Sequence, residues 1–362
     1  MRKYIFCYLV AFATLFIGSC QNKGASYNGS SAYNEIADSL QKAEKLPGIF
    51  IGILDNGKRT YYSAGFADPD KKMVFDSATL FEIGSISKTF TAYILESVLK
   101  EKNISDSNSI ISYLPDSVRS NTLLEKISFY NLLNHSSGLP RLPENMDLTS
   151  NPMSPYDGYY ADHLFSYLKT CTPRPDGKSN FSNLGAGLAG VLAQRIAGKP
   201  YESLLAQYIF QPFSIKQHPD STIAATTNKA QGYFTTINNQ SPYWFADVLA
   251  PAGGLKCSAD EILSYLEKMA APENGSSQQI IEHLLTPTIT VTPEIKVCRA
   301  WHTMEKKDSP VIYWHNGGTY GFSTFAGFLK EKKKAVVIVV NQFNKNKVSD
   351  KLGFSILEKI TN

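Results

Sequence analysis

The chain has few cysteines for its 362 residues, and this scarcity restricts the chemistry that it can carry. Cys7 and Cys20 lie in or next to an apolar N-terminal segment, which leaves only Cys171, Cys257 and Cys298. Three widely spaced cysteines allow at most one disulfide and form no zinc-binding pair. The six histidines also lack the spacing of a metal-binding motif. We therefore expect neither a metal nor a cofactor.

An excess of charge of one sign is also missing. The chain has 36 basic and 32 acidic residues and no basic stripe, so nucleic acid is not an expected partner. It contains no fixed-period repeat. It also lacks a Gly-x-Ser-x-Gly elbow, and this absence disfavours an esterase of the α/β-hydrolase type.

The longest apolar run, Tyr4 to Ile17, is short for a membrane span and typical of a signal-peptide core. It follows Arg2 and Lys3, and it ends at Gly18-Ser19-Cys20, which resembles a bacterial lipobox. We predict a lipoprotein-type signal peptide over 1–20, lipidation at Cys20 and a flexible tether over 21–31. The folded part would then be anchored to the membrane of the bacterial cell envelope. The alternative is a leader that is uncleaved, or cleaved without lipidation.

Strand patterns occur at both ends of the remaining chain and helical patterns in its middle. Residues 49–54 and 59–65 are predicted strands joined by Asp55-Asn56-Gly57-Lys58, in which Asn-Gly is a strong hairpin signal. Further strands are predicted over 311–314, 322–329 and 335–340, and terminal helices over 33–45 and 349–360.

This order predicts one α+β domain over 32–362. We expect an antiparallel sheet built from both chain ends, about 32–95 and 295–362, and flanked by helices. A mostly helical lobe of about 96–294 is inserted into it. A cleft between the two lobes is the natural place for chemistry.

The first motif that can carry chemistry is Ser85-Ile86-Ser87-Lys88, at the start of a predicted helix. Residues i and i+3 lie on one helical face, so Lys88 can reach the Ser85 hydroxyl. A buried, neutral lysine can accept the proton and activate the serine. Helix-start amides can stabilise a developing oxyanion. The alternative is that Ser85 only caps the helix, and Ser-x-x-Lys also occurs at Ser39 and Ser166.

Two further motifs follow in a fixed order: Phe181-Ser182-Asn183 and then His315-Asn316-Gly317-Gly318. The series Ser-x-x-Lys, aromatic-x-Asn, His-x-Gly resembles the β-lactamase-related serine hydrolases. These include class C β-lactamases, D-alanyl-D-alanine carboxypeptidases, D-aminopeptidases and certain esterases. Segments 81–92, 132–140 and 252–260 also resemble blocks of that family. The resemblance implies a β-lactamase/transpeptidase-like fold.

By position, the resemblance implies that Ser85 is acylated and that Lys88 accepts or relays its proton. Asn183 would hydrogen-bond Lys88 or the substrate amide, and His315 would line the site. The backbone amides of Ser85 and Gly318 would form the oxyanion hole. Phe181, Asn316 and Gly317 would contact the substrate. His135, in a scaffold block, is interpreted as structural.

The chain departs from the family's pattern at Phe181, where a tyrosine is usual. Losing a general acid–base typically costs about 10²–10⁴ in rate, unless Lys88 suffices or Tyr159 or Tyr160 substitutes in space. Asp176 stands where glycine is common, which can reshape the loop before Phe181. His315, where many relatives have lysine, is mostly neutral at pH 7. A neutral side chain there fits a D-peptidase or an esterase better than a specialised β-lactamase.

The sequence therefore predicts an envelope serine hydrolase that works through a Ser85 acyl-enzyme. D-amino-acid peptides, β-lactams or small esters are its expected substrates. The alternative is a catalytically impaired relative that binds peptidoglycan fragments or acts as an envelope binding protein.

Overall fold

The computed structural model describes residues 29–273, 275–330 and 332–361, so the predicted leader and Cys20 lie outside the described residues. Helix α1 spans Gly29–Ala43 and precedes a hairpin of β1 (Gly48–Asp55) and β2 (Lys58–Gly65). Asn56 and Gly57 both have positive φ, 50° and 81°, as a tight two-residue hairpin turn requires. The predicted hairpin is confirmed.

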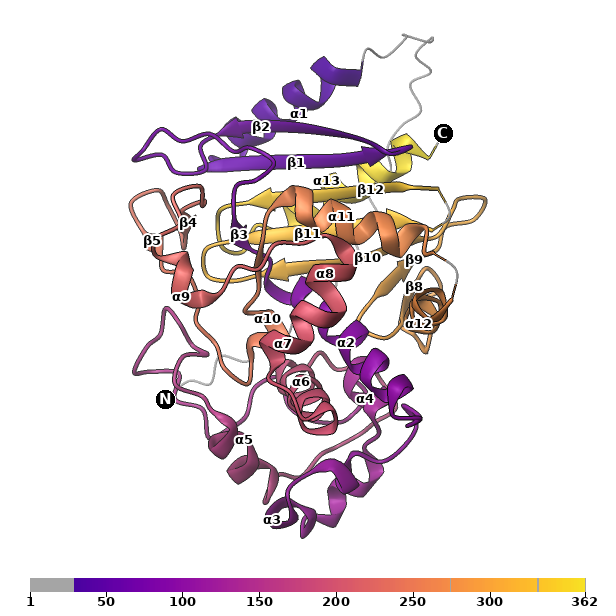
Figure 1. Cartoon of the computed structure of the whole chain (residues 1–362). Coiled ribbons are helices and arrows are strands. Elements are labelled where there is room, and N and C mark those ends of the chain that lie inside the picture. Colours follow the sequence, from indigo (N-terminus) through magenta and orange to yellow (C-terminus); the bar gives the residue numbers. More distant parts are fainter. Residues whose placement is uncertain (1–28, 274, 331, 362) are drawn as a thin grey trace.

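Eight antiparallel strands form the main sheet, in the order β2-β1-β12-β11-β10-β9-β8-β7. The C-terminal strands are β7 (Ile289–Thr290), β8 (Ile295–Val297), β9 (His302–Met304), β10 (Ile312–Gly318), β11 (Ser323–Leu329) and β12 (Lys334–Val340). Strand β1 pairs with β12 from Ile49↔Val340 to Asp55↔Lys334, so the two chain ends meet inside the sheet (Figure 1).

Each face of this sheet buries its own hydrophobic core. Val336, Ile338 and Val340 of β12 pack on the face covered by α1 and α13 (Asn346–Ile360). Val337 and Val339 belong to the larger core on the opposite face, where α11 (Ala259–Ala270) packs. A strand buried on both faces needs a continuous apolar run, and residues 335–340 supply it.

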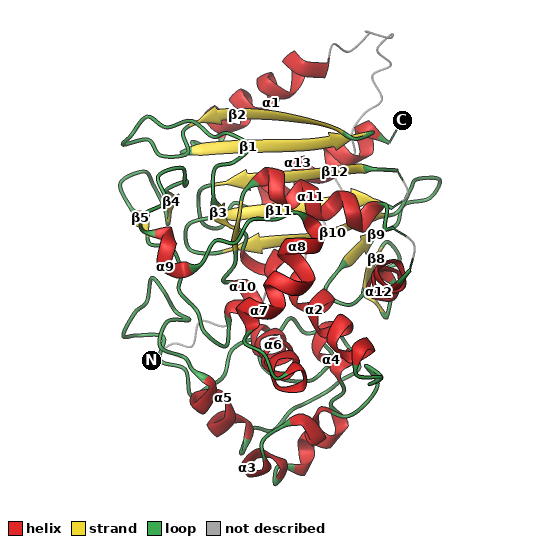
Figure 2. Ribbon diagram, in the orientation of Figure 1, coloured by secondary structure: helices red, strands yellow, loops and turns green. Residues whose placement is uncertain are grey.

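Most of the other helices gather below the sheet (Figure 2). The two longest are α2 (Ser87–Glu101) and α6 (Asn183–Ala197), which pack against each other. The shorter helices are α3 (Asp116–Arg119), α4 (Phe129–Leu133), α5 (Ala161–Leu168), α7 (Tyr201–Leu205), α8 (Gln211–Phe213), α9 (Asp220–Ile223), α10 (Ala250–Gly253) and α12 (Ser276–Leu285). Single turns cover Gly84–Ile86, Ile110–Tyr113, Thr122–Lys126 and, as a π-helix, Ala206–Phe210. Two small sheets pair β3 (Phe81–Glu82) with β6 (Lys256–Cys257), and β4 (Gly232–Tyr233) with β5 (Gln240–Ser241).

The predicted fold class is confirmed: an antiparallel sheet built from both chain ends, flanked by helices and carrying a mostly helical insertion. One helix inside the range expected for the helical lobe behaves differently, because α11 packs on the sheet. Among the described residues, no helix is both long and apolar enough to cross a membrane. Cys171, Cys257 and Cys298 are buried free thiols.

Candidate active site

The Ser85 turn lies where the sheet meets the helical insertion. Ser85 belongs to the 3₁₀ turn Gly84–Ile86 that leads into α2, and it is partly exposed. Gly84 has φ +53°, a conformation that glycine adopts without strain. The Ser87 hydroxyl donates to Gly84 O at 2.7 Å and accepts from Leu255 N at 3.2 Å, which fixes the turn. Neither this turn nor α2 has a side-chain N-cap, so Ser85 does not cap the helix.

Lys88 lies one helical turn later and is almost completely buried. Its Nζ lies 3.0 Å from Ser85 Oγ, 2.8 Å from Asn183 Oδ1 and 2.5 Å from Ala252 O. Burial, followed by the positive charge of Arg141, holds the pKa of Lys88 well below its usual value. A neutral amine has two hydrogens and one lone pair. The amide and carbonyl oxygens accept the two hydrogens, and the lone pair is left for the Ser85 hydroxyl.

Asn183 begins α6 and completes this polar group. The preceding Ser182 caps the helix by accepting from Gly185 N at 2.9 Å. Asn183 Oδ1 accepts from Lys88, while its Nδ2 donates to the hydroxyl of Tyr156 at 2.6 Å. The structure therefore brings Ser85, Lys88 and Asn183 together, and it adds Tyr156, which the sequence analysis missed.

The two tyrosines suggested as substitutes for a phenol at position 181 do not reach Lys88. Tyr159 donates instead to Asn145 Oδ1 at 2.9 Å. Tyr160 is half-exposed and stacks on His163. Tyr156 stands in a Pro155-Tyr156-Asp157-Gly158 segment that looks like an ordinary turn, so no local pattern marks it.

Phe181 contributes an aromatic face to the site and no ionisable group. Lys88 Nζ lies 4.5 Å from the centroid of its ring, and Arg141 Cζ lies 5.1 Å from it. The ring of His135 packs at 4.8 Å. His135 Nδ1 also accepts from Ser182 N at 3.2 Å, a contact that suits the structural role expected for this histidine. Phe181 therefore adjoins the lysine but can neither accept nor donate its proton.

His315 on β10 is buried, with 1% of its surface exposed. Its Nδ1 bonds Asn316 O at 2.6 Å, so Nδ1 carries the proton and Nε2 keeps a lone pair. Among the described residues, Nε2 has no hydrogen-bond partner. Burial, then His302 and Lys88, hold the pKa of His315 well below its usual value. His315 is therefore neutral and cannot hold a carboxylate as a charged lysine does.

Asn316 points away from this group. Its Nδ2 donates to Asp350 Oδ2 of α13 at 2.7 Å, on the opposite face of the sheet. Burial raises the pKa of Asp350 to about 7. The side chain of Asn316, expected to contact the substrate, is thus placed on the α13 side.

Gly317 and Gly318 have no side chain, so the backbone at the end of β10 lies directly against the Ser85 turn. A Cβ on Gly317 would lie 2.0 Å from Ile83 O, and one on Gly84 would lie 2.5 Å from Gly318 N. The Gly318 amide is therefore a close neighbour of the Ser85 turn, as an oxyanion hole requires. The buried carboxylate of Glu82 secures this contact, because it accepts from the Thr319 hydroxyl at 2.6 Å and from Trp244 N.

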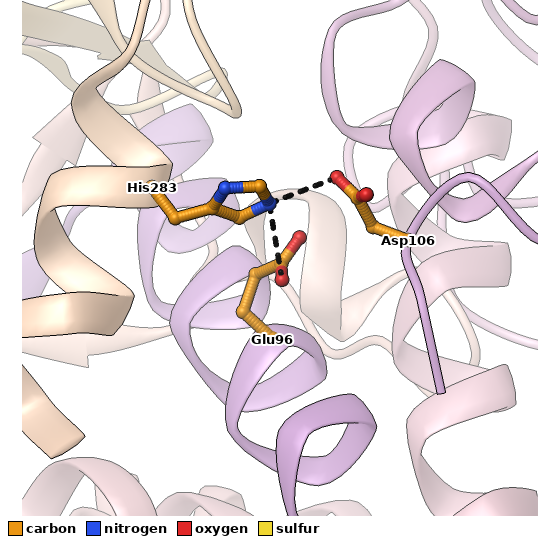
Figure 3. Close-up of side chains that lie close together, drawn as sticks. All are labelled: Glu96, Asp106 and His283. Carbon is orange, nitrogen blue, oxygen red and sulfur yellow. Dashed lines mark hydrogen bonds and ion pairs between the residues drawn. The ribbon is translucent and has the colours of Figure 1, made fainter. Parts of the chain in front are cut away.

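A second group of titratable side chains lies at the other end of α2 (Figure 3). His283 Nε2 is 3.0 Å from Asp106 Oδ2 and 3.7 Å from Glu96 Oε2. Arg299 Nε lies 2.8 Å from Asp106 Oδ2 and 3.8 Å from Glu96 Oε1. Since the guanidinium already supplies a cation to both carboxylates, we interpret this group as an ion-pair network that joins α2 to α12.

Comparison with known proteins agrees with this geometry. A family model described as Beta-lactamase matches residues 34–359. A Beta-lactamase of Providencia stuartii is 26% identical over 363 residues, covering 90% of each chain. A crystal structure named Beta-Lactamase/D-Alanine Carboxypeptidase, from Pseudomonas syringae, superposes with a TM-score of 0.77 at 24% identity, covering 91% of this chain and 98% of that one. A class C beta-lactamase from Rhodobacter sphaeroides gives 0.74 at 20% identity, covering 91% and 99%. The chain belongs to the beta-lactamase family.

Proposed function

We propose that this chain is a serine hydrolase that forms an acyl-enzyme on Ser85. The observation that carries the proposal is the set of three contacts at Lys88 Nζ. Two of them consume the hydrogens of a neutral amine, so its lone pair can accept the Ser85 proton.

The reaction follows from that proton transfer. As the proton moves to Lys88 Nζ, Ser85 Oγ bonds to the substrate carbonyl carbon, and the amides of Ser85 and Gly318 hold the oxyanion. The leaving group departs with the proton that Lys88 received. Water then attacks the ester while one of its protons moves to Lys88. That proton passes from Lys88 Nζ to Ser85 Oγ as the Ser85–acyl bond breaks, which releases the acid product and restores the neutral pair. Atoms and charges balance without a cofactor.

D-amino-acid peptides, β-lactams and small esters are the substrate classes that we propose. One relative is named both a beta-lactamase and a D-alanine carboxypeptidase, which supports the first two classes by analogy alone. His315 is neutral, so a substrate carboxylate needs another cation. We assign this role to the exposed Arg141, whose Cζ lies 5.1 Å from the centroid of the Phe181 ring.

Intact-protein mass spectrometry tests the function directly. The folded chain is incubated separately with a fluorophosphonate, a β-lactam and a D-alanyl ester, and adducts are followed over time. We expect one adduct per chain, absent in Ser85→Ala and retained in Ser166→Ala, whose serine begins another Ser-x-x-Lys. A transient adduct would indicate turnover and a permanent one a stalled deacylation. No adduct with any reagent would favour the binding-protein alternative, which Phe181 motivates.

We also propose that the chain is a lipoprotein of the bacterial cell envelope, anchored through Cys20. The support is the apolar run before Gly18-Ser19-Cys20. Cys20→Ala is expected to move the protein from the membrane fraction to the soluble fraction when cells are fractionated by ultracentrifugation. Cys7→Ala, inside the same apolar run, is the matched control and should remain membrane-bound. A Cys20→Ala protein that stays in the membrane pellet would point to another anchor.

A further inference from the structure

We infer that Tyr156 is a substrate-recognition residue whose hydroxyl donates to a carbonyl group in the acyl part of the substrate, beside the scissile carbonyl. This inference rests on the proposed function and narrows its substrate class. It favours N-acyl amino acid derivatives and β-lactams with acylamino side chains over simple alkanoyl esters.

The first observation is that Tyr156 ends a continuous line of hydrogen bonds from the nucleophile. The line runs from Ser85 Oγ to Lys88 Nζ at 3.0 Å, to Asn183 Oδ1 at 2.8 Å, and from Asn183 Nδ2 to Tyr156 Oη at 2.6 Å. Asn183 is expected to bind either Lys88 or a substrate amide. One N–H of its amide is committed to Tyr156, so the Tyr156 hydroxyl directly adjoins the residue that is expected to bind substrate.

The second observation is the direction of that last hydrogen bond. The amide N–H of Asn183 can only donate, so Tyr156 Oη is the acceptor. The hydroxyl proton of Tyr156 remains unused, since no described residue accepts it. Burial raises the pKa of Tyr156 to about 12, so the hydroxyl stays protonated at neutral pH. The hydroxyl is therefore a buried donor that has no acceptor among the described residues, and leaving such a donor unpaired costs free energy.

The third observation places Tyr156 beside the reacting centre. A Cβ on Gly253 would lie 3.9 Å from Tyr156 Cε2 and 3.7 Å from Gly84 C, so Gly253 is the spacer between the phenol and the Ser85 turn. The Tyr156 ring packs edge-on against Trp244 at 4.9 Å, and Trp244 packs against Tyr320 at 5.0 Å. This aromatic packing fixes the position of the Tyr156 hydroxyl without forming a hydrogen bond to it. A carbonyl oxygen of the bound acyl group is the acceptor that would complete the line.

A pair of thioesters with the same thiol leaving group tests this inference: N-acetyl-D-alanyl and propionyl. Both present the same kind of scissile carbonyl, and only the first has a second carbonyl nearby. For Tyr156→Phe we expect kcat/KM to fall about 10-fold or more with the N-acetyl-D-alanyl thioester, because one buried hydrogen bond is lost. With the propionyl thioester, kcat/KM should change less than about 2-fold, because this substrate offers no second carbonyl oxygen to the Tyr156 hydroxyl.

Tyr159→Phe is the matched control, because its hydroxyl donates to Asn145 and lies outside the hydrogen-bond line. It should leave both rates unchanged. Thermal melting of each variant checks that the fold is retained. An equal loss with both thioesters would show that Tyr156 acts only through the fold, and no loss with either would show that it does not touch the substrate. Both results overturn the inference while Ser85 adducts persist. A wild-type chain that forms no adduct instead overturns the proposed function.

Discussion

Replacing Lys88 by methionine is expected to slow acylation of Ser85 by about 10²–10⁴-fold, the usual contribution of a positioned general base. Methionine keeps a long apolar stem in the buried site but has no lone-pair nitrogen within reach of Ser85 Oγ. The second-order rate of fluorophosphonate adduct formation, followed by intact-protein mass spectrometry, measures the effect. Lys169→Met is the control, because Lys169 is the exposed lysine of the other Ser-x-x-Lys motif and should not matter.

The pH profile of the same reaction shows whether Lys88 acts as a general base or has only a structural role. Only the neutral amine can accept the serine proton, so the acylation rate of the wild-type chain falls as pH drops through the folded-state pKa of Lys88. Burial and Arg141 depress that pKa, so activity extends well below the range of an ordinary lysine. Lys88→Met should lose this acid limb. A variant that keeps both the wild-type rate and the limb would remove Lys88 from the mechanism.

Replacing Gly84 by alanine is expected to lower acylation by about 10²–10³-fold, the cost of losing one oxyanion donor. The new Cβ would lie 2.5 Å from Gly318 N, so the Ser85 turn and the end of β10 must separate. The two amides would then no longer converge on one oxygen atom. Stopped-flow or mass-spectrometric acylation rates check this result, alongside the melting temperature.

Gly57→Ala is the control for Gly84→Ala, because it introduces the same kind of backbone strain without displacing the Gly318 amide. Gly57 also has positive φ, +81°, but an added Cβ there meets nothing within 4 Å. Both substitutions therefore incur the left-handed backbone penalty of about 1–2 kcal/mol, and only Gly84→Ala forces β10 away. If both variants acylated at the wild-type rate, the Gly318 amide would have no part in oxyanion stabilisation.

Local sequence patterns were sufficient to predict five of the eight strands of the sheet and the central pair of the site, but not the short strands β7, β8 and β9. The Asn56-Gly57 turn dictates the β1–β2 hairpin, and the β-branched residues of 335–340 predict a strand. Ser85 and Lys88 share one helical turn, so their contact needs only the helix that the sequence predicts. Asn183 required the family resemblance, because the contact with Lys88 joins two different helices.

The remaining features depend on tertiary contacts or on strand parity. Tyr156 reaches Asn183 from a turn that has no distinctive pattern, so only the packing reveals it. The orientation of Asn316 could have been deduced. Successive strand residues face opposite sides, so if His315 faces Lys88 then Asn316 must face α13. The packing of α11 on the sheet is a tertiary contact, which short-range periodicity does not encode.

The pairing of β1 with β12 also determines how late in synthesis the main sheet can be completed. A ribosome that has reached residue 318 has already synthesised Ser85, Lys88, Asn183 and His315, yet β11 and β12 do not exist. Nothing then joins the β1–β2 hairpin to β10, and closing so long a loop is slow. A premature stop codon ahead of residue 334 would yield a product with unpaired strand edges, prone to aggregation. Activity and solubility therefore both depend on the synthesis of β12, the last strand of the chain.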